Sequence, residues 1–174
     1  LDAALLAKEV HRSWLEMLND SKQLTSKERN YLRPLIEKYA QAWAVVEVTA
    51  EEIDQINILN ASIIGMQRAL DKLNIVPQHI IVDGNKWKPY IPEGQVMEIP
   101  TRTVVKGDGK YLSIAAASVL AKTYRDEYML HLHEQYPHYH WDTNMGYPTK
   151  AHYEAIKQHG ITPYHRKSFK LNKV

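Results

Sequence analysis

The sequence has no cysteine, no long apolar run and little net charge, and each of these absences narrows its class. Without cysteine the 174-residue chain can form neither a disulfide scaffold nor a thiolate zinc site, which fits a reducing cytoplasm. No apolar stretch approaches the ~18 residues of a membrane span, and no signal-peptide pattern opens the chain. A net charge of +2 is too small to indicate a partner. We therefore expect one ordinary globular, cytoplasmic domain.

The positive charge lies mainly near the C-terminus. Residues 137–174 contain six lysines and arginines but two acidic residues, and residues 164–174 contain no acidic residue. A basic segment with many aromatic residues is typical of a surface that binds phosphates. The same composition also suits a solvated surface followed by a floppy tail. Composition alone leaves both interpretations open.

Hydrophobic periodicity and capping motifs predict alternating helices and strands. Thr25 and Glu28 have the spacing of a capping box, so a helix should run from Ser26 to about residue 39. Further helices are expected shortly after residue 49, across residues 59–73, from residue 113 to before residue 137, and at residues 149–159. Strands rich in β-branched residues are expected at residues 42–48, 79–82, 96–99 and 102–105. This alternation indicates an α/β domain built around a mixed sheet.

Two aspartates follow two of the predicted strands. Asp83 closes the strand at 79–82, and Asp108 lies in the turn after the strand at 102–105. Hard cations such as Mg²⁺ and Mn²⁺ prefer oxygen ligands, and a pair of them can hold the attacking and leaving oxygens of a phosphodiester. An aspartate next to glycine is also common as a turn residue that accepts hydrogen bonds from nearby backbone amides. The two aspartates are therefore candidate metal ligands, with a structural role as the alternative.

Further candidates lie on the predicted helix that starts at residue 113 and in the loop after it. Ser118, Lys122 and Asp126 recur every four residues and so form one stripe. This stripe either carries an exposed Lys122–Asp126 ion pair, or Ser118 and Lys122 bind phosphate while Asp126 orients them or a metal-bound water. Tyr147 lies between a glycine and a proline in a stiff turn, where its ring either packs under the loop or stacks on a sugar or base.

Several short blocks occur in an order that resembles a known family. The blocks are Asn19–Leu24, Glu52–Asp54, Asn57–Ala61, Val82–Asn85, Lys106–Asp108, Ser113–Ser118, Ala121–Lys122, Arg125–Asp126, Gly146–Thr149 and His165–Phe169. Together they span residues 19–169 and closely resemble bacterial ribonuclease HII. The number of blocks in the right order makes coincidence an unsatisfactory explanation.

The resemblance implies a ribonuclease H-like fold, in which helices flank a mixed sheet. Residues 1–136 would form the catalytic core and residues 137–174 a helical, basic, substrate-binding extension, within one compact unit. The implied activity is that of an endoribonuclease that cuts the RNA strand of RNA–DNA hybrids and ribonucleotides embedded in duplex DNA, during DNA replication and repair. Two divalent ions, Mn²⁺ or Mg²⁺, would serve as cofactors, and we expect a monomer.

The resemblance also assigns roles to individual residues. Asp83 and Asp108 match two of the four carboxylates that hold the family's metal ions, and they are expected to be catalytic. Tyr147 would stack on the sugar next to the scissile junction. The phosphates would be held by Lys22, Ser118 and Lys122. Asp126, which matches a further acidic position of the family, and Arg166 are weaker site candidates.

The family's other two carboxylates belong to an N-terminal strand motif resembling Asp-Glu-Ala-Gly-Arg-Gly, which this sequence lacks. The chain starts at Leu1 rather than methionine, which suggests a processed or truncated chain. Two carboxylates hold one hard cation weakly. The Gly-Arg-Gly backbone, which the family uses to detect the ribose 2′-hydroxyl, is missing as well. We therefore expect the chain as printed to be inactive or nearly so.

Two other classes of function stay open at this point. A non-catalytic nucleic-acid-binding domain on the same fold is the alternative if the N-terminal motif is truly absent from the gene. A histidine-based metal-storage or metal-sensing protein would require His131, His138 and His140 to converge. Histidines two residues apart lack the usual spacing of a zinc site, which argues against this last class.

Overall fold

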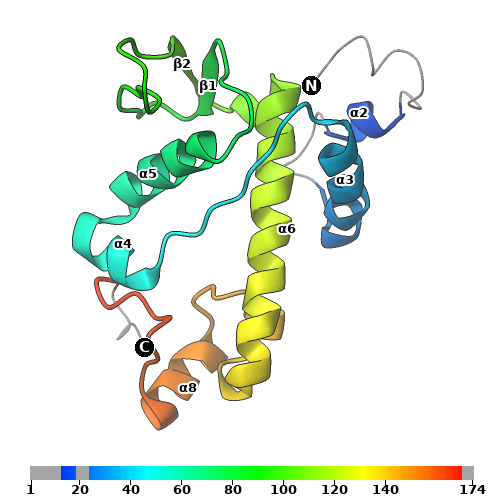
Figure 1. Cartoon of the computed structure of the whole chain (residues 1–174). Helices are drawn as coiled ribbons and strands as arrows, with labels where there is room; N and C mark the ends of the chain where they lie inside the picture. The colour runs from blue at the N-terminus through cyan, green and yellow to red at the C-terminus, as the bar shows by residue number, and fades with distance from the viewer. Residues whose placement is uncertain (1–12, 19–23, 170–174) are drawn as a thin grey trace. The chain divides into compact units, whose positions relative to one another are not determined.

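The computed structural model describes residues 13–18 and 24–169 (Figure 1). The chain forms two compact units. Unit 1 comprises Leu1–Val46 and Met66–Thr123, and unit 2 comprises Glu47–Gly65 and Tyr124–Val174. Two of the boundaries fall within helices, one in α5 (Ile58–Asp71) and one in α6 (Leu112–Gln135). The domain boundary that the sequence suggests at residue 136 stays a prediction.

Unit 1 combines helices with a small sheet. Besides parts of α5 and α6, it contains α2 (Ser13–Leu18), α3 (Ser26–Tyr39), β1 (Ile80–Asp83), β2 (Thr101–Val104) and the 3-10 helix η1 (Gly107–Gly109). Unit 2 adds α4 (Ala50–Ile56), the 3-10 helix η2 (Pro137–Tyr139), α7 (Trp141–Asn144) and α8 (Lys150–His159). No helix in the described part of the chain is long and apolar enough to cross a membrane.

The sheet is smaller than the sequence predicts. Within the described residues it has two strands, β1 and β2, which run parallel with Ile80 opposite Thr101 and Asp83 opposite Val104. The strands expected at 42–48 and 96–99 are wrong, because neither segment forms a ladder with a described neighbour. β-Branched composition favours an extended backbone, but a strand also needs a hydrogen-bonded partner. Val96 is 96% exposed, as expected for a residue outside a packed sheet.

Local sequence signals place the helix ends correctly. Thr25 Oγ1 accepts a hydrogen bond from the Glu28 amide at 3.3 Å, and the Glu28 carboxylate accepts one from the Thr25 amide at 2.7 Å. The same reciprocal pair starts α4 at Thr49 and Glu52. These bonds satisfy amides that the first turn of a helix leaves without partners. Gly160 ends α8 with a φ of +78°, a backbone conformation that favours glycine.

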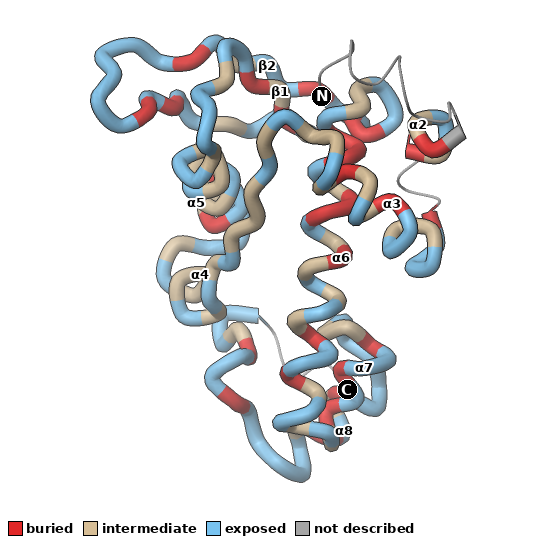
Figure 2. The backbone as a smooth tube through the Cα atoms, turned by 45° about the vertical axis from the view of Figure 1, so that its right-hand side comes forward, coloured by how far each residue is buried: buried red, intermediate tan, exposed pale blue. Residues whose placement is uncertain are grey.

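Each unit has its own hydrophobic cluster. In unit 1, β1 contributes to a cluster formed by Ile80, Val82, Tyr90 and Ile99. In unit 2, the buried positions of α6 meet those of η2, α7 and α8 (Figure 2); the cluster is formed by Met129, Leu132, Tyr139, Trp141 and Ala155. The Tyr139 hydroxyl donates a hydrogen bond to the Gly160 carbonyl at 2.9 Å, which ties the cluster to the end of α8. The packing of unit 2 therefore depends on the C-terminal half of α6.

A pair of leucines on α6 tests this dependence. Leu132 is 2% exposed, and Leu132→Ala should lower the free energy of unfolding by about 2–5 kcal/mol because it leaves a cavity in the cluster. Leu130 is 46% exposed on the same helix, and Leu130→Ala should change that free energy by less than about 0.5 kcal/mol. Urea unfolding followed by circular dichroism measures both. Equal losses in the two variants would contradict the assigned core.

Candidate active site

Asp83 and the turn that carries Asp108 meet at one edge of the sheet. Parallel strands place their carboxyl ends at the same edge, so the last residue of β1 lies beside the turn that follows β2. The amide of Gly107 donates a hydrogen bond to Asp83 Oδ1 at 2.8 Å. Asp83 is exposed, whereas Asp108 is 4% exposed in η1. The structure thus joins two segments that are 24 residues apart in the chain.

Gly107 allows this close approach. A Cβ atom at this position would lie 2.5 Å from Ile114 Cδ1 and 3.4 Å from Val104 Cβ, so a larger residue would push the turn away from α6 and β2. Lys106, just before it, has a φ of +56° in the left-handed region, which turns the chain sharply at the end of β2. The Lys-Gly-Asp sequence therefore gives the turn a fixed shape beside Asp83.

The two carboxylates suit a hard divalent cation as part of its ligand set. Aspartate oxygens are preferred ligands of Mg²⁺ and Mn²⁺. Asp83 is exposed at the end of its strand, and the amide that bonds one of its oxygens fixes the side chain. Among the described residues, no group of three or more histidines and carboxylates could hold a metal ion. Asp83 and Asp108 therefore stay candidate ligands as a pair, and they do not form a complete metal site within the described residues.

The other candidates on α6 are half-buried. Ser118 and Lys122 lie in unit 1, and Asp126 lies farther along the same helix, in unit 2. Their four-residue spacing on one continuous helix confirms that they share a stripe. Phosphate binding by this stripe stays a prediction. Lys22 lies outside the described residues.

In unit 2, Tyr147 projects from a turn that is held at several points. The Tyr147 ring is 68% exposed, which excludes the interpretation that it packs under the loop. The Tyr147 amide donates to the Asn144 carbonyl at 2.7 Å, and the Gly146 amide donates to Asn144 Oδ1 at 2.8 Å. Arg125 Nη2 donates to the Met145 carbonyl at 3.3 Å. The Tyr147 side chain is therefore exposed to solvent on a turn that several hydrogen bonds hold in place.

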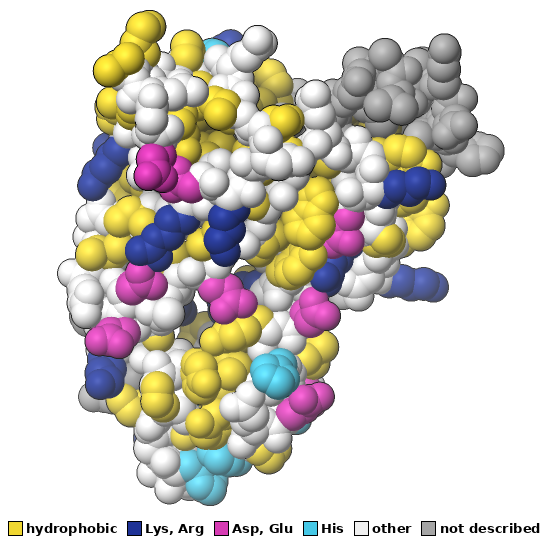
Figure 3. All heavy atoms as spheres, viewed as in Figure 1, with side chains coloured by type: hydrophobic (Ala, Val, Ile, Leu, Met, Phe, Trp, Pro, Cys, Tyr) yellow, Lys and Arg dark blue, Asp and Glu magenta, His cyan; other side chains and the backbone are white. Residues whose placement is uncertain are grey.

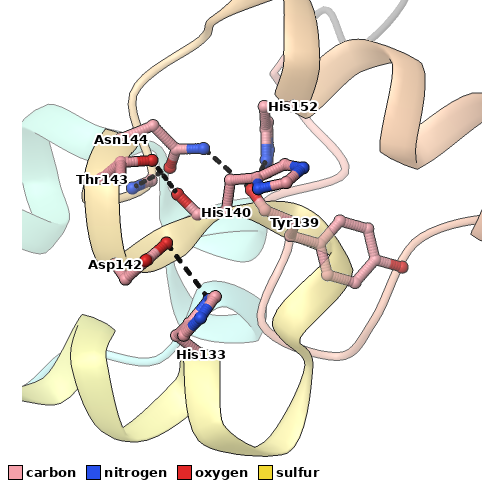
Figure 4. A network of polar contacts seen from close by, with 8 residues as sticks. His133, Tyr139, His140, Asp142, Thr143, Asn144 and His152 are labelled. Atoms are coloured by element: carbon pink, nitrogen blue, oxygen red, sulfur yellow. Dashed lines mark hydrogen bonds and ion pairs between the residues drawn. The ribbon is translucent and has the colours of Figure 1, made fainter.

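Asn144 and Arg125 are supporting residues that the sequence did not single out for this turn. Asn144 Nδ2 donates to the Tyr139 carbonyl at 2.8 Å, a bond drawn in Figure 4. The adjoining positive φ of Met145, +47°, is unusual for a residue other than glycine and marks the turn as constrained. An asparagine shortly before a glycine is a turn signal, and it was available in the sequence.

Comparisons with known proteins show the family to which the chain belongs. A sequence model of the family described as "Ribonuclease HII" matches residues 3–172. The ribonuclease HII of Bacteroides thetaiotaomicron is 61% identical over 97% of this chain and 80% of its own length. That of Parabacteroides distasonis is 62% identical over 97% of this chain and 81% of its own length. The chain belongs to the ribonuclease HII family.

The fold of the family is supported by a solved structure. The ribonuclease H2 from Pyrococcus horikoshii OT3 matches with a TM-score of 0.74 and 29% identity, over 91% of this chain and 81% of that one. Family membership makes the protein a ribonuclease H, a metal-dependent endonuclease and hydrolase. The family generally uses divalent ions, and its substrates are RNA–DNA hybrids. Nothing in these comparisons supports the expectation that the chain is inactive.

The histidines do not form the metal site of the third hypothesis. Exposed histidines gather near the ends of α6 and α8 (Figure 3), where the His138 and His159 rings lie 4.1 Å apart between centroids. His131 instead faces Glu134 on α6, with 3.5 Å between His131 Nδ1 and Glu134 Oε2. The described residues contain no group of three that would converge on a metal. The metal-storage hypothesis is therefore wrong for this part of the chain.

His165, the first residue of the His-Arg-Lys-Ser-Phe block, is a buried and neutral group. The Thr162 amide donates a hydrogen bond to His165 Nδ1 at 3.0 Å. Its ring stacks on that of His152, with 5.3 Å between centroids and 15° between planes. Burial first, and then repulsion by His152, lowers the pKa of His165 to about 4. Burial also lowers the pKa of His152.

These histidines predict how stability depends on pH. The unfolded chain takes up a proton on His165 near its ordinary pKa of 6.5, whereas the folded chain does so near 4. Unfolding therefore binds a proton between these values, and the free energy of unfolding should fall as the pH falls from 6.5 toward 4. His165→Asn keeps an acceptor but cannot titrate, so it should make this slope shallower. Urea unfolding at several pH values measures it, and an unchanged slope would contradict the burial of a neutral ring.

Proposed function

We propose that the protein hydrolyses the RNA strand of RNA–DNA hybrids and cuts at ribonucleotides embedded in duplex DNA. The observation that supports this most directly is the meeting of Asp83 with the Asp108 turn at the carboxyl ends of two parallel strands. Membership of the ribonuclease HII family supports the same reaction class. We infer from the family that the protein serves DNA replication and repair.

The catalytic chemistry rests on carboxylates that hold divalent metal. When bound, a pair of Mg²⁺ or Mn²⁺ ions supplies a water activated for in-line attack on phosphorus and offsets the charge on the leaving 3′ oxygen. Asp83 and Asp108 would supply part of the oxygen ligand set that holds these ions. The Gly107 amide orients Asp83 by occupying one side of its Oδ1 atom. The turn around Asp108 is fixed by the close packing of Gly107 against α6.

The remaining candidates would bind the nucleic acid. The exposed ring of Tyr147 would stack on the sugar next to the scissile junction, because its braced turn presents it to solvent. Phosphates would be bound by Lys22, Ser118 and Lys122, and Arg166 is a weaker candidate for the same role. Asp126, whose carboxylate repels phosphate, is a weaker candidate for a supporting role at the site. Phosphate contacts of this kind set the position of the duplex and carry no sequence information.

Replacing Asp83 tests the metal chemistry. A duplex with one ribonucleotide should be cleaved with Mg²⁺ or Mn²⁺ and not in EDTA. Asp83→Asn keeps the side-chain shape but loses the charge, so kcat/KM should fall by more than about 100-fold, beyond the usual effect of a residue that merely supports a metal ligand. The exposed Glu98 in unit 1 provides the control, and Glu98→Gln should cleave normally.

The assay should use both the 174-residue chain and a chain extended by the family's N-terminal motif. Comparison of the two decides whether the printed chain is inactive, as its sequence suggested. Cleavage in EDTA, or an Asp83→Asn variant with near-normal activity, would refute metal-ion catalysis. Tight binding of the duplex without cleavage by either chain would favour the non-catalytic nucleic-acid-binding alternative.

Replacing Tyr147 separates recognition from stability. Tyr147→Ala should lose about 1–3 kcal/mol of interaction with a duplex that carries one ribonucleotide, since base or sugar stacking is worth that much. Long hybrids offer many registers and should be affected less. Tyr31, 57% exposed on α3, provides the matched control, and Tyr31→Ala should leave cleavage unchanged. A large drop in melting temperature with normal cleavage by the folded fraction would instead show that Tyr147 is structural.

A further inference from the structure

In unit 2, the carboxylate of Asp54 holds the segment 166–169. The Lys167 amide donates to Asp54 Oδ2 at 2.7 Å, and the Ser168 amide donates to Asp54 Oδ1 at 2.9 Å. The Ser168 hydroxyl also donates to Oδ1, at 2.5 Å. These bonds, chiefly that of the Ser168 side chain, lower the pKa of Asp54. One carboxylate thus fixes two successive residues that lie more than a hundred positions away in the chain.

The short helix that carries Asp54 is itself fixed at both ends. The capping box of Thr49 and Glu52 starts α4. Asn57 ends it with a φ of +66°, and the Asn57 amide donates to the Ile53 carbonyl at 2.9 Å. Asn57 Oδ1 then accepts hydrogen bonds from the amides of Leu59 and Asn60, both at 3.1 Å, at the start of α5. Hydrogen bonds at both ends of α4 therefore fix the helix that carries Asp54.

Arg166, at the start of the held segment, packs its guanidinium on an aromatic ring. Its guanidinium carbon lies 3.9 Å from the centroid of the Phe169 ring. Burial first, and then repulsion by Arg125, lowers the pKa of Arg166, while Asp54 raises it. Within the described residues the guanidinium donates no hydrogen bond to another side chain or carbonyl. A half-buried arginine whose N–H groups donate to none of the described residues, beside a second arginine, suits a phosphate.

We propose that Asp54 is a positioning residue for substrate binding. By holding Lys167 and Ser168, it sets the Arg166 guanidinium on Phe169 in the orientation that binds a backbone phosphate of the nucleic acid. Asp54 does not touch the substrate in this arrangement and acts through Arg166. The inference rests on the proposed function, because it takes the ligand to be the sugar–phosphate backbone of a duplex.

Electrostatics alone and a positioning role predict opposite changes in duplex affinity when Asp54 is removed. Removing an acidic side chain from the surface of a nucleic-acid-binding protein ordinarily strengthens binding, because it reduces repulsion of the phosphates. A positioning role predicts the opposite, since the loss of Asp54 releases Arg166 and loses a phosphate contact. Glu51 lies one turn earlier on α4 and is exposed, so Glu51→Ala removes the same charge without touching the segment 166–169.

The experiment measures binding rather than cleavage. Fluorescence anisotropy in EDTA follows a labelled DNA duplex with one ribonucleotide, at several salt concentrations, for wild type, Asp54→Ala, Glu51→Ala, Arg166→Gln and the Asp54→Ala/Arg166→Gln double variant. Asp54→Ala should weaken binding about tenfold, at the low end for a hydrogen-bonded charge. It should also reduce the slope of log Kd against log salt by about 0.9, the value of one phosphate contact. Glu51→Ala should bind as tightly as wild type or more tightly.

The double variant shows whether Asp54 acts through Arg166. Asp54→Ala should cause no further loss of affinity or of salt slope once Arg166 is glutamine, because residues that act as one unit are not additive. Additive losses would overturn the positioning role. If Asp54→Ala does not fold, as judged by its melting curve, Ser168→Ala removes a single bond to Asp54 and should weaken binding in the same direction. A Ser168→Ala protein with wild-type Kd and salt slope would then overturn the proposal.

The binding data also distinguish failure of the proposed nucleic-acid substrate from failure of the role of Asp54. If wild type binds no duplex under any salt condition, the proposed nucleic-acid substrate is wrong. A second outcome is that wild type binds the duplex and Arg166→Gln lowers the salt slope, while Asp54→Ala binds like Glu51→Ala. This outcome would support the nucleic-acid substrate and refute the positioning role of Asp54.

Discussion

The parallel pairing of β1 and β2 is the constraint on which the candidate active site depends. The register that places Asp83 opposite Val104 also lets the Gly84 amide donate to the Val104 carbonyl at 2.9 Å. The chain then turns at Lys106 and returns the Gly107 amide to the Asp83 carboxylate. A shift of one residue in this register would send the side chain of Asp83 to the other face of the sheet. Two short strands therefore decide where the acidic side chains lie.

Unit 2 is organised by polar side chains that bind backbone groups. Asn144 holds the turn of Tyr147, the Thr162 amide bonds His165, and Asp54 holds the segment 166–169. Loops form few of the backbone hydrogen bonds found in helices and sheets. Their amides and carbonyls therefore need side-chain partners when the loop has a fixed conformation. This explains how segments without regular structure can present an exposed tyrosine and a half-buried arginine in defined orientations.

The two units contain different kinds of candidate site residue. Unit 1 supplies carboxylates, the hard ligands that divalent metal ions need, from a short sheet. Unit 2 contains the exposed Tyr147 and the half-buried Arg166, which suit sugars and phosphates, and unit 1 adds the phosphate-binding candidates Ser118 and Lys122. In the proposed function, metal chemistry and substrate binding would therefore rest on different residues. Membership of the ribonuclease HII family is consistent with both sets.

The sequence by itself determined the family and the local structure. Capping boxes and a terminal glycine act within four residues, so the ends of α3, α4 and α8 could be predicted. The strands at Asp83 and before Lys106 were also predicted, with the aspartates at their ends. Such signals need no knowledge of distant parts of the chain.

Only the tertiary structure decided which segments find partners. The residues at 42–48 have strand composition but no described strand to pair with, because pairing depends on neighbours that composition does not reveal. The bond from Arg125 to Met145 and those from Lys167 and Ser168 to Asp54 join residues that are far apart in sequence. The burial of His165, which lowers its pKa, likewise comes from rings brought together by folding. Long-range contacts arise from packing, and packing is set by the whole fold rather than by any local pattern.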